Sequence, residues 1–219
     1  MASAAVTRIL VLGAVSLFQP VNGYQVLREL KSWSVEDWAE VRAGSIYSML
    51  NSLCKQGLLV RHDLAEEDRA VAVYELSEAG REEFPDLVRR ALDGAAGLNQ
   101  VMFQVGWSFA PALPRSDVLT AMRRRLGSVA ERRDALEVKI TNDELPSHVR
   151  YGLGLDHRLA EAEHDWLAEL VQLLEGGFLY FAGESGDPWQ PPEDDAGWEM
   201  VDQAKRYREL IARQRQEES

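Results

Sequence analysis

The 219-residue sequence is poor in cysteine, in long apolar runs and in basic charge. Its one cysteine, Cys54, cannot form an intramolecular disulfide, which excludes a disulfide-rich secreted scaffold and fits a reducing cytoplasm. The apolar start, residues 1–18, is too short to span a bilayer, and it contains one basic residue, Arg8, and no small-residue cleavage pattern. We therefore expect a cytoplasmic globular protein that does not bind a membrane.

The sequence also lacks the motifs of common enzymes. It contains no glycine-rich phosphate loop, no nucleophile elbow and no paired cysteine ligands. His157, Glu161 and His164 share one face of a predicted helix and could hold a metal, but this spacing arises often by chance on a charged helix. We expect no enzymatic activity, no metal and no cofactor.

The net charge of −12 argues against a polyanion as partner for the chain as a whole. Residues 1–80 contain 7 basic and 10 acidic residues, and the rest of the chain contains 17 and 26. Most of the acidic excess therefore lies in the second part. Because neither part is basic, binding to DNA would depend on the local placement of charge.

Residues 1–80 have the pattern of a small helical domain that carries a β-hairpin. Apolar residues have helical spacing in three segments and gather in two short segments that are typical of strands. Gly57 is placed to end the third helix. The predicted elements are helices at Val6–Leu17, Tyr24–Ser32 and Ser45–Gln56, strands at Leu58–Leu64 and Ala70–Leu76, and a helix capped by Ser77. This is the order of a winged helix-turn-helix, a fold that places one helix against DNA.

The third helix is the element predicted to read DNA. Ile46, Leu50 and Leu53 recur at i, i+4 and i+7, the spacing of a buried stripe. The other face carries hydroxyls, an amide and a lysine, which can donate hydrogen bonds to phosphates and base edges without acidic neighbours. The predicted DNA-binding residues are Arg42, Ser45, Tyr47, Ser48, Asn51, Lys55, Arg61 and Arg69.

Short motifs occur in a fixed order along this domain. They are Gly23-Tyr24, then Gly44-Ser45-Ile46-Tyr47 with Leu50 and Leu53, then Gly57-Leu58, and finally Tyr74-Glu75-Leu76-Ser77-Glu78-Ala79-Gly80. In this order and spacing they resemble the PadR family of bacterial transcriptional regulators. Residues 103–139 and the Glu-x-x-Trp-Leu core at 163–167 resemble the C-terminal helices of longer members. The resemblance covers about residues 6–177.

The resemblance and the element pattern together predict two domains in a mainly α protein with a small β-hairpin wing. Residues 1–92 are expected to form the winged helix-turn-helix, and residues 93–219 a helical domain for dimerisation and effector binding. An acidic loop rich in proline and glycine is predicted at 183–197, and an amphipathic helix at Trp198–Gln214.

The hairpin tip departs from the family pattern. Family members often carry several basic residues there, whereas this tip reads Ala65-Glu66-Glu67-Asp68. Only Arg61, His62 and Arg69 remain to meet phosphates, and the acids would oppose contact with the DNA backbone. Recognition is therefore expected to depend on the third helix. The same acidic tip supports a second interpretation, a winged-helix adaptor or ligand sensor that does not bind DNA.

Two long helices are predicted at 115–140 and 147–182. Acidic neighbours indicate that the arginine cluster of the first helix, at 123–125 and 132–133, is an ion-paired surface rather than a DNA-binding one. The second helix has an apolar stripe with the spacing of either a core or a seam with another chain. Since major-groove readers usually bind as two-fold dimers, we predict a homodimer. The predicted dimer interface residues are Leu159, Ala162, Trp166, Leu170 and Leu173.

Met102, Phe103, Trp107 and Phe109 gather just after the winged domain. Aromatic clusters at a domain junction form either core or a pocket for a small apolar ligand. The family resemblance implies the pocket, because some members respond to phenolic acids or drugs. The predicted function is thus a homodimeric repressor that binds a pseudo-palindromic operator and is released by a small aromatic effector.

Overall fold

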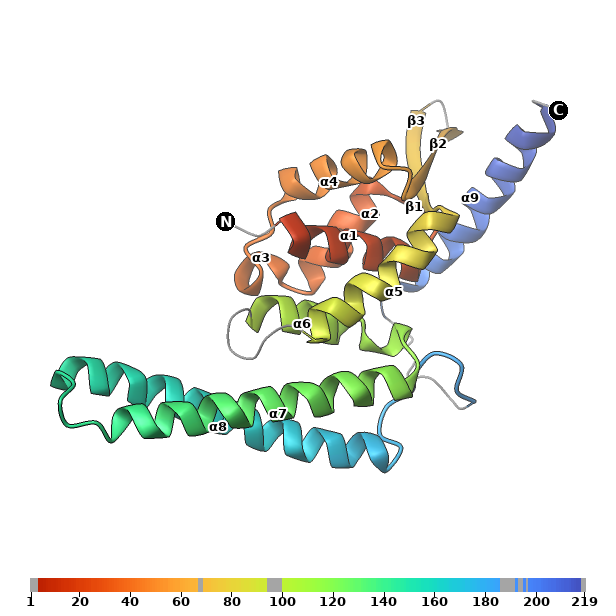
Figure 1. The fold of residues 1–219 in the computed structure, drawn as a ribbon. Coiled ribbons are helices and arrows are strands. Elements are labelled where there is room, and N and C mark those ends of the chain that lie inside the picture. Colours follow the sequence, from red (N-terminus) through yellow and green to blue (C-terminus); the bar gives the residue numbers. More distant parts are fainter. Residues whose placement is uncertain are drawn as a thin grey trace. The chain divides into compact units, whose positions relative to one another are not determined.

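The computed structural model describes residues 4–66, 69–93, 100–185, 192, 195 and 197–217. The chain divides into two compact units, Met1–Leu87 with Asp187–Ser219, and Val88–Gly186. The described residues are mostly helical and contain one three-stranded sheet, as the sequence predicted (Figure 1). Within the described ranges, no helix has both the length and the apolar character needed to cross a bilayer.

The first unit contains the predicted winged helix-turn-helix, with two small additions that the sequence did not indicate. These are the two-residue strand β1 and the short helix α3. Its elements are α1 (Ala4–Phe18), β1 (Val21–Asn22), α2 (Gly23–Ser32), α3 (Val35–Trp38), α4 (Ala43–Lys55), β2 (Leu59–Glu66), β3 (Arg69–Leu76) and α9 (Gly197–Glu217). Helix α5 (Glu78–Asp93) begins in this unit and ends in the other.

Helix α1 forms the centre of the first unit. Leu10, Leu12 and Val15 are fully buried, because α1 contacts α2, α4, β3 and α9. Helix α2 begins at a capping box, in which the Asn22 side chain accepts a hydrogen bond from the Gln25 amide at 2.9 Å and the Gln25 side chain accepts one from the Asn22 amide at 2.8 Å. The helix-turn-helix therefore starts at a fixed point after β1.

The ends of α4 are set by different features. The prediction that Ser45 caps this helix is wrong, because Arg42 is the N-cap residue and Ser45 lies inside the first turn. Arg42 makes no side-chain capping bond, and its carbonyl accepts from the amides of Ser45 at 2.9 Å and Ile46 at 3.3 Å. The predicted stop at Gly57 is confirmed. Its φ of 74° allows the Leu58 amide to donate to the Leu53 carbonyl at 3.0 Å, which is a Schellman motif.

The wing is an antiparallel hairpin in a sheet of order β1-β3-β2. Strands β2 and β3 pair from Leu59↔Leu76 to Glu66↔Arg69. Ser77 caps α5 as predicted, since its hydroxyl accepts from the Gly80 amide at 3.0 Å and donates to the Gly57 carbonyl at 2.6 Å. A Cβ on Gly80 would lie 2.1 Å from the Leu58 carbonyl oxygen, so the hairpin and α5 can approach this closely only with glycine there.

Helix α9 packs with the winged unit, whereas the sequence assigned it to the second domain. Tyr207 and Ile211 are buried against Leu64 and Val73 of the hairpin. The apolar face predicted for this helix consists of Val201, Ala204, Leu210 and Ile211. It is correct in part, because Ala204 and Ile211 are buried but Val201 is exposed. The burial of Tyr207 was missed, since its position at one side of the predicted apolar face did not distinguish it from a surface tyrosine.

The second unit consists of α6 (Gln100–Ser108), a 3-10 turn at Ala110–Ala112, and a long antiparallel pair, α7 (Arg115–Ile140) and α8 (Ser147–Glu175). The bounds of α7 agree with the prediction. Helix α8 is shorter than predicted, because Gly177 adopts a φ of 90° and the Phe178 amide donates to the Leu173 carbonyl at 2.9 Å. This second Schellman motif ends the helix before residue 182.

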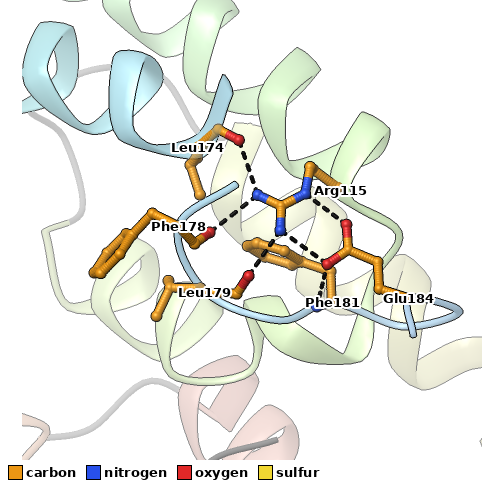
Figure 2. A network of polar contacts seen from close by, with 6 residues as sticks. All are labelled: Arg115, Leu174, Phe178, Leu179, Phe181 and Glu184. Carbon is orange, nitrogen blue, oxygen red and sulfur yellow. Dashed lines mark hydrogen bonds and ion pairs between the residues drawn. The ribbon is translucent and has the colours of Figure 1, made fainter. Parts of the chain in front are cut away.

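One arginine holds the turn that follows α8 (Figure 2). The Arg115 guanidinium donates to the carbonyls of Leu174, Phe178 and Leu179 at 2.7–2.9 Å. It also pairs with Glu184 and stacks 4.8 Å from the ring centroid of Phe181. The first residue of α7 therefore satisfies carbonyls at and beyond the C-terminus of α8. The predicted loop at 183–197 lies largely outside the described residues.

Candidate nucleic-acid interface

Helix α4 divides into a buried stripe and an exposed polar face. Ile46, Leu50 and Leu53 are at most 1% exposed. The side chains on the opposite face are exposed, including Tyr47 at 42%. This group consists of Ser45, Tyr47, Ser48, Asn51 and Lys55, with Arg42 exposed at the N-cap. The six predicted DNA-binding residues at this helix therefore form one accessible surface.

The surface is held in place by tight packing behind it. Helix α4 contacts α1, α2 and β2. A Cβ on Gly23, the first residue of α2, would lie 2.9 Å from Cε1 of Tyr47 and 3.4 Å from Cδ1 of Leu50. The ring of Tyr47 thus lies against the backbone of α2, so glycine at position 23 determines where the phenol points.

The hairpin presents less positive charge than its sequence suggests. Arg61 forms an ion pair with Asp63 of the same strand, with Nη2 and Oδ1 2.7 Å apart. His62 lies on the other face of the strand, where its Nε2 is 2.8 Å from Glu75. Arg69, the third predicted cation, is exposed at the start of β3. Tip residues Glu67 and Asp68 lie outside the described residues.

Cys54 is half-buried on α4. Burial raises the pKa of its thiol, and the positive charge of Arg61 opposes that shift only in part. The thiol is therefore protonated and weakly nucleophilic at neutral pH.

The second unit contains a hollow of about 500 Å³ between α6, α7 and α8. Phe103 and Trp107, both predicted for the effector pocket, line it together with Trp166, which the sequence assigned to the dimer interface. Trp166 meets Phe103 and Trp107 edge to face, with ring centroids 6.0 and 5.9 Å apart. Met102 and Phe109, the other two predicted pocket residues, are not among the lining residues, and Phe109 is buried in the core.

Beside this hollow lies an ion pair that the sequence did not predict. Arg125 is buried, whereas we expected a solvated surface residue. Its Nε is 2.8 Å from the Glu163 carboxylate, and its guanidinium carbon lies 3.9 Å from the Phe103 ring centroid. Polar and aromatic groups are thus combined beside the hollow, as is common in small-molecule sites.

The other arginines of the cluster mostly lie on the surface, as predicted. Arg123 and Arg124 are exposed and pair with Glu175 and Asp93, both at 2.6 Å. Arg133 is half-buried and pairs with Asp134 at 2.8 Å, and Arg132 lines the hollow. In the described part of the chain, no three His, Cys, Asp or Glu side chains come together as metal ligands.

An apolar stripe runs along the exposed side of α8. Leu159 is 60% exposed, and Ala162, Trp166 and Leu173 are exposed on the same side. Tyr151 and Leu155 extend the stripe by two turns and were missed by the sequence interpretation. Leu170 does not belong to it. That residue is 5% exposed, because it lies on the side of α8 that packs within the unit.

Comparison with known proteins gives a family match for residues 11–86. Residues 11–86 match the Transcriptional regulator PadR-like family. No curated protein matches the chain. The chain is similar to the crystal structure of Bacillus subtilis PadR in complex with operator DNA, with 17% sequence identity, coverage of 76% of this chain and 98% of that chain, and a TM-score of 0.35. The family assignment rests on the sequence match and not on this structural similarity. Residues 11–86 therefore form a domain of the PadR-like family of transcriptional regulators.

Proposed function

We propose that the chain is a sequence-specific DNA-binding repressor that acts as a homodimer and is released from its operator by a small aromatic molecule. The observation that carries this proposal is the exposed face of α4. It combines hydroxyl, amide, phenol and ammonium groups with no carboxylate, inside a domain that matches a family of transcriptional regulators.

The chemistry of this face fits the major groove. An asparagine side chain can pair with an adenine edge through two hydrogen bonds, and Asn51 lies at the middle of the exposed surface. Tyr47 and the serine hydroxyls reach either base edges or phosphates, and Lys55 supplies a charge for the backbone. We assign the selection of bases to Asn51 and Tyr47, and the positioning of α4 on the DNA backbone to Lys55.

The exposed stripe of α8 supports the dimer. Leu155, Leu159, Ala162 and Trp166 follow one another at alternating spacings of four and three residues, the spacing of a seam between two helices. A two-fold seam would present two copies of α4 to two half-sites of a pseudo-palindrome. Once one copy of α4 has bound its half-site, binding of the second copy is intramolecular. Two modest contacts therefore give a tight complex.

The hollow and the stripe share residues, which supports a link between effector and operator. Leu159, Ala162 and Trp166 belong to both. A flat aromatic molecule among Phe103, Trp107 and Trp166 would therefore touch the seam between the two copies. If the bound molecule favours one geometry of the seam over another, it changes the distance between the two copies of α4. This change alters the affinity of the dimer for DNA.

The central test is the double variant Tyr47→Ala/Asn51→Ala. Genomic fragments bound by the wild-type protein are selected and footprinted, and we expect a pseudo-palindrome with half-sites about one helical turn apart. The double variant should lose at least about tenfold in affinity for this fragment, since each bidentate base contact contributes about 1–3 kcal/mol. Tyr180→Ala/Asn142→Ala removes the same groups from exposed positions of the second unit and is the matched control. Equal affinity of the double variant and this control would refute α4 as the reading helix.

A second candidate is an adaptor or ligand sensor that does not bind DNA. The pairing of Arg61 with Asp63 favours it, because it removes one of the few cations available to the wing. Titration of genomic DNA at decreasing salt separates the two functions. Binding that strengthens as salt is lowered supports the regulator, and absence of binding at low salt supports the adaptor.

A further inference from the structure

Helix α9 lies along the outer face of the wing. Val73 of β3 packs against Tyr207 and Ile211 of α9. Tyr74 is the next residue and therefore points to the other face, where its strand partner Arg61 interacts electrostatically with Cys54 of α4. The hairpin thus separates α4 from α9.

The contacts of α9 give its direction along the hairpin. Near its start, Glu199 pairs with Arg28 of α2 at 3.4 Å. Midway, the Tyr207 hydroxyl accepts from Asn22 of β1 at 2.9 Å. Further on, Leu210 and Ile211 pack in the cluster that contains Leu64 and Val71, a strand pair close to the tip. The helix therefore runs from the base of the wing to its tip.

The last turn of α9 continues beyond that cluster. Each helical residue adds about 1.5 Å, so Arg213 and Arg215 lie about 3 and 6 Å further along the axis than Ile211. Figure 1 shows the middle of α9, in blue, beside the strands and its C-terminal end extending past them and away from the hairpin. Both arginines are exposed.

Helix α9 contains five basic and four acidic residues, and its positive charge is concentrated in the stretch before Glu217, whereas positive charge is scarce in the wing. Residues 204–216 contain five basic residues and one acidic residue, whereas the tip at 65–68 contains three acidic residues and no basic one. The basic residues of α9 are Lys205, Arg206, Arg208, Arg213 and Arg215. The local charge that a DNA-binding wing needs is thus present, but on the helix beside it.

We infer that the C-terminal end of α9 is a second DNA-contacting element. Because Arg213 and Arg215 lie on different sides of the helix, at least one of them contacts phosphates of the duplex that flanks the half-site read by α4, on the far side of the wing. This inference rests on the proposed function, because it requires α4 to occupy the major groove. A guanidinium suits the role, since its fork of donors matches a phosphate and it stays charged at any physiological pH.

The test is the salt dependence of binding by the full chain to a random-sequence duplex of about 30 base pairs, long enough for two half-sites and their flanks. In the variant Arg213→Gln/Arg215→Gln, the slope of log K against log salt should fall by about 1–2, because each phosphate contact contributes about 0.9. The two residues lie on different sides of the helix, so the single variants show which one contributes more.

The control is Arg123→Gln/Arg124→Gln, which removes the same charge from exposed positions of α7. It should leave the slope as in the wild type. On the selected genomic fragment, footprints of the α9 variant should be shorter at their outer edges, and its preference for that fragment over random DNA should be unchanged, since phosphate contacts do not read sequence.

The outcomes separate this inference from the proposed function. If the wild type shows no salt-sensitive binding, both fail. If the wild type binds and the α9 variant keeps the wild-type slope, the inference alone is overturned. A lower melting temperature with an unchanged slope overturns it too, and shows instead that these arginines serve to neutralise the acidic wing tip.

Discussion

Arg125 of α7 and Glu163 of α8 form an ion pair that is almost completely removed from solvent, with side-chain exposures of 2% and 14%. Because the charged guanidinium is buried and has lost its hydration, the carboxylate beside it is needed to compensate its charge. The Glu163→Ala variant leaves an uncompensated buried charge and should destabilise the second unit by about 3–5 kcal/mol in urea unfolding. The matched control is Glu175→Ala, which breaks the exposed pair with Arg123 and should cost about 0–1 kcal/mol. Equal losses in the two variants would contradict this account.

The Arg115–Glu184 pair predicts a dependence of stability on acid pH. Hydrogen bonding by Arg115 lowers the pKa of Glu184 below its ordinary value of 4.5. The carboxylate therefore stabilises the folded state above pH 4.5, and this contribution disappears as the pH falls through the lower folded-state pKa. Thermal melting measured between about pH 6 and 3 should show a steeper loss for the wild type than for Glu184→Gln. Parallel curves would show that the pair does not contribute.

A substitution at Gly23 should alter DNA recognition although Gly23 is not itself one of the proposed DNA-binding residues. In Gly23→Ala the new Cβ must displace the ring of Tyr47, which it would otherwise approach to 2.9 Å. Because the ring end can rotate away, we expect a small change in stability but a severalfold loss of affinity for the selected fragment. Gly127→Ala is the control, since its Cβ meets nothing within 4 Å on α7. The control should gain up to about 1 kcal/mol of stability and bind DNA normally.

The exposed stripe of α8 predicts the oligomeric state. In Leu155→Glu/Leu159→Glu two carboxylates would enter the proposed seam, so sedimentation should show a monomer where the wild type is a dimer. The variant should retain its helical content and lose affinity for the two-half-site fragment. Val138→Glu places a carboxylate on an exposed apolar position of α7 and should remain dimeric. A wild-type monomer at micromolar concentration would exclude the seam.

The sequence alone was sufficient to predict structural features that depend on residues close together in the chain. The face of α4 could be predicted because Ile46, Leu50 and Leu53 repeat at helical spacing, and the stop at Gly57 because a positive φ favours glycine. The end of α8 was misplaced, although Gly176-Gly177 is a comparable signal, because apolar residues continue up to Phe181.

Features that depend on distant residues could not be predicted. Arg125 belongs to a cluster of five arginines at 123–125 and 132–133, and only its contacts with distant residues, such as Glu163 38 residues away, distinguish it as a core residue. Arg115 likewise caps a helix that ends 59 or more residues later. In the hollow, Phe103 and Trp107 were identified from their clustering, but Trp166 was assigned to the seam alone because nothing in its own segment shows that α6 lies beside it.

The position of α9 has a consequence for the order of folding. Asn22 and Tyr207 are in contact although 185 residues separate them. During synthesis the winged unit therefore waits for α9, and until that helix leaves the ribosome Leu64 and Val73 lack the side chains that bury them. A nascent hairpin with an open apolar face is prone to pair with other chains. The synthesis of α9 thus determines when the winged unit reaches its final form, and a chain that stops before α9 would be prone to aggregate.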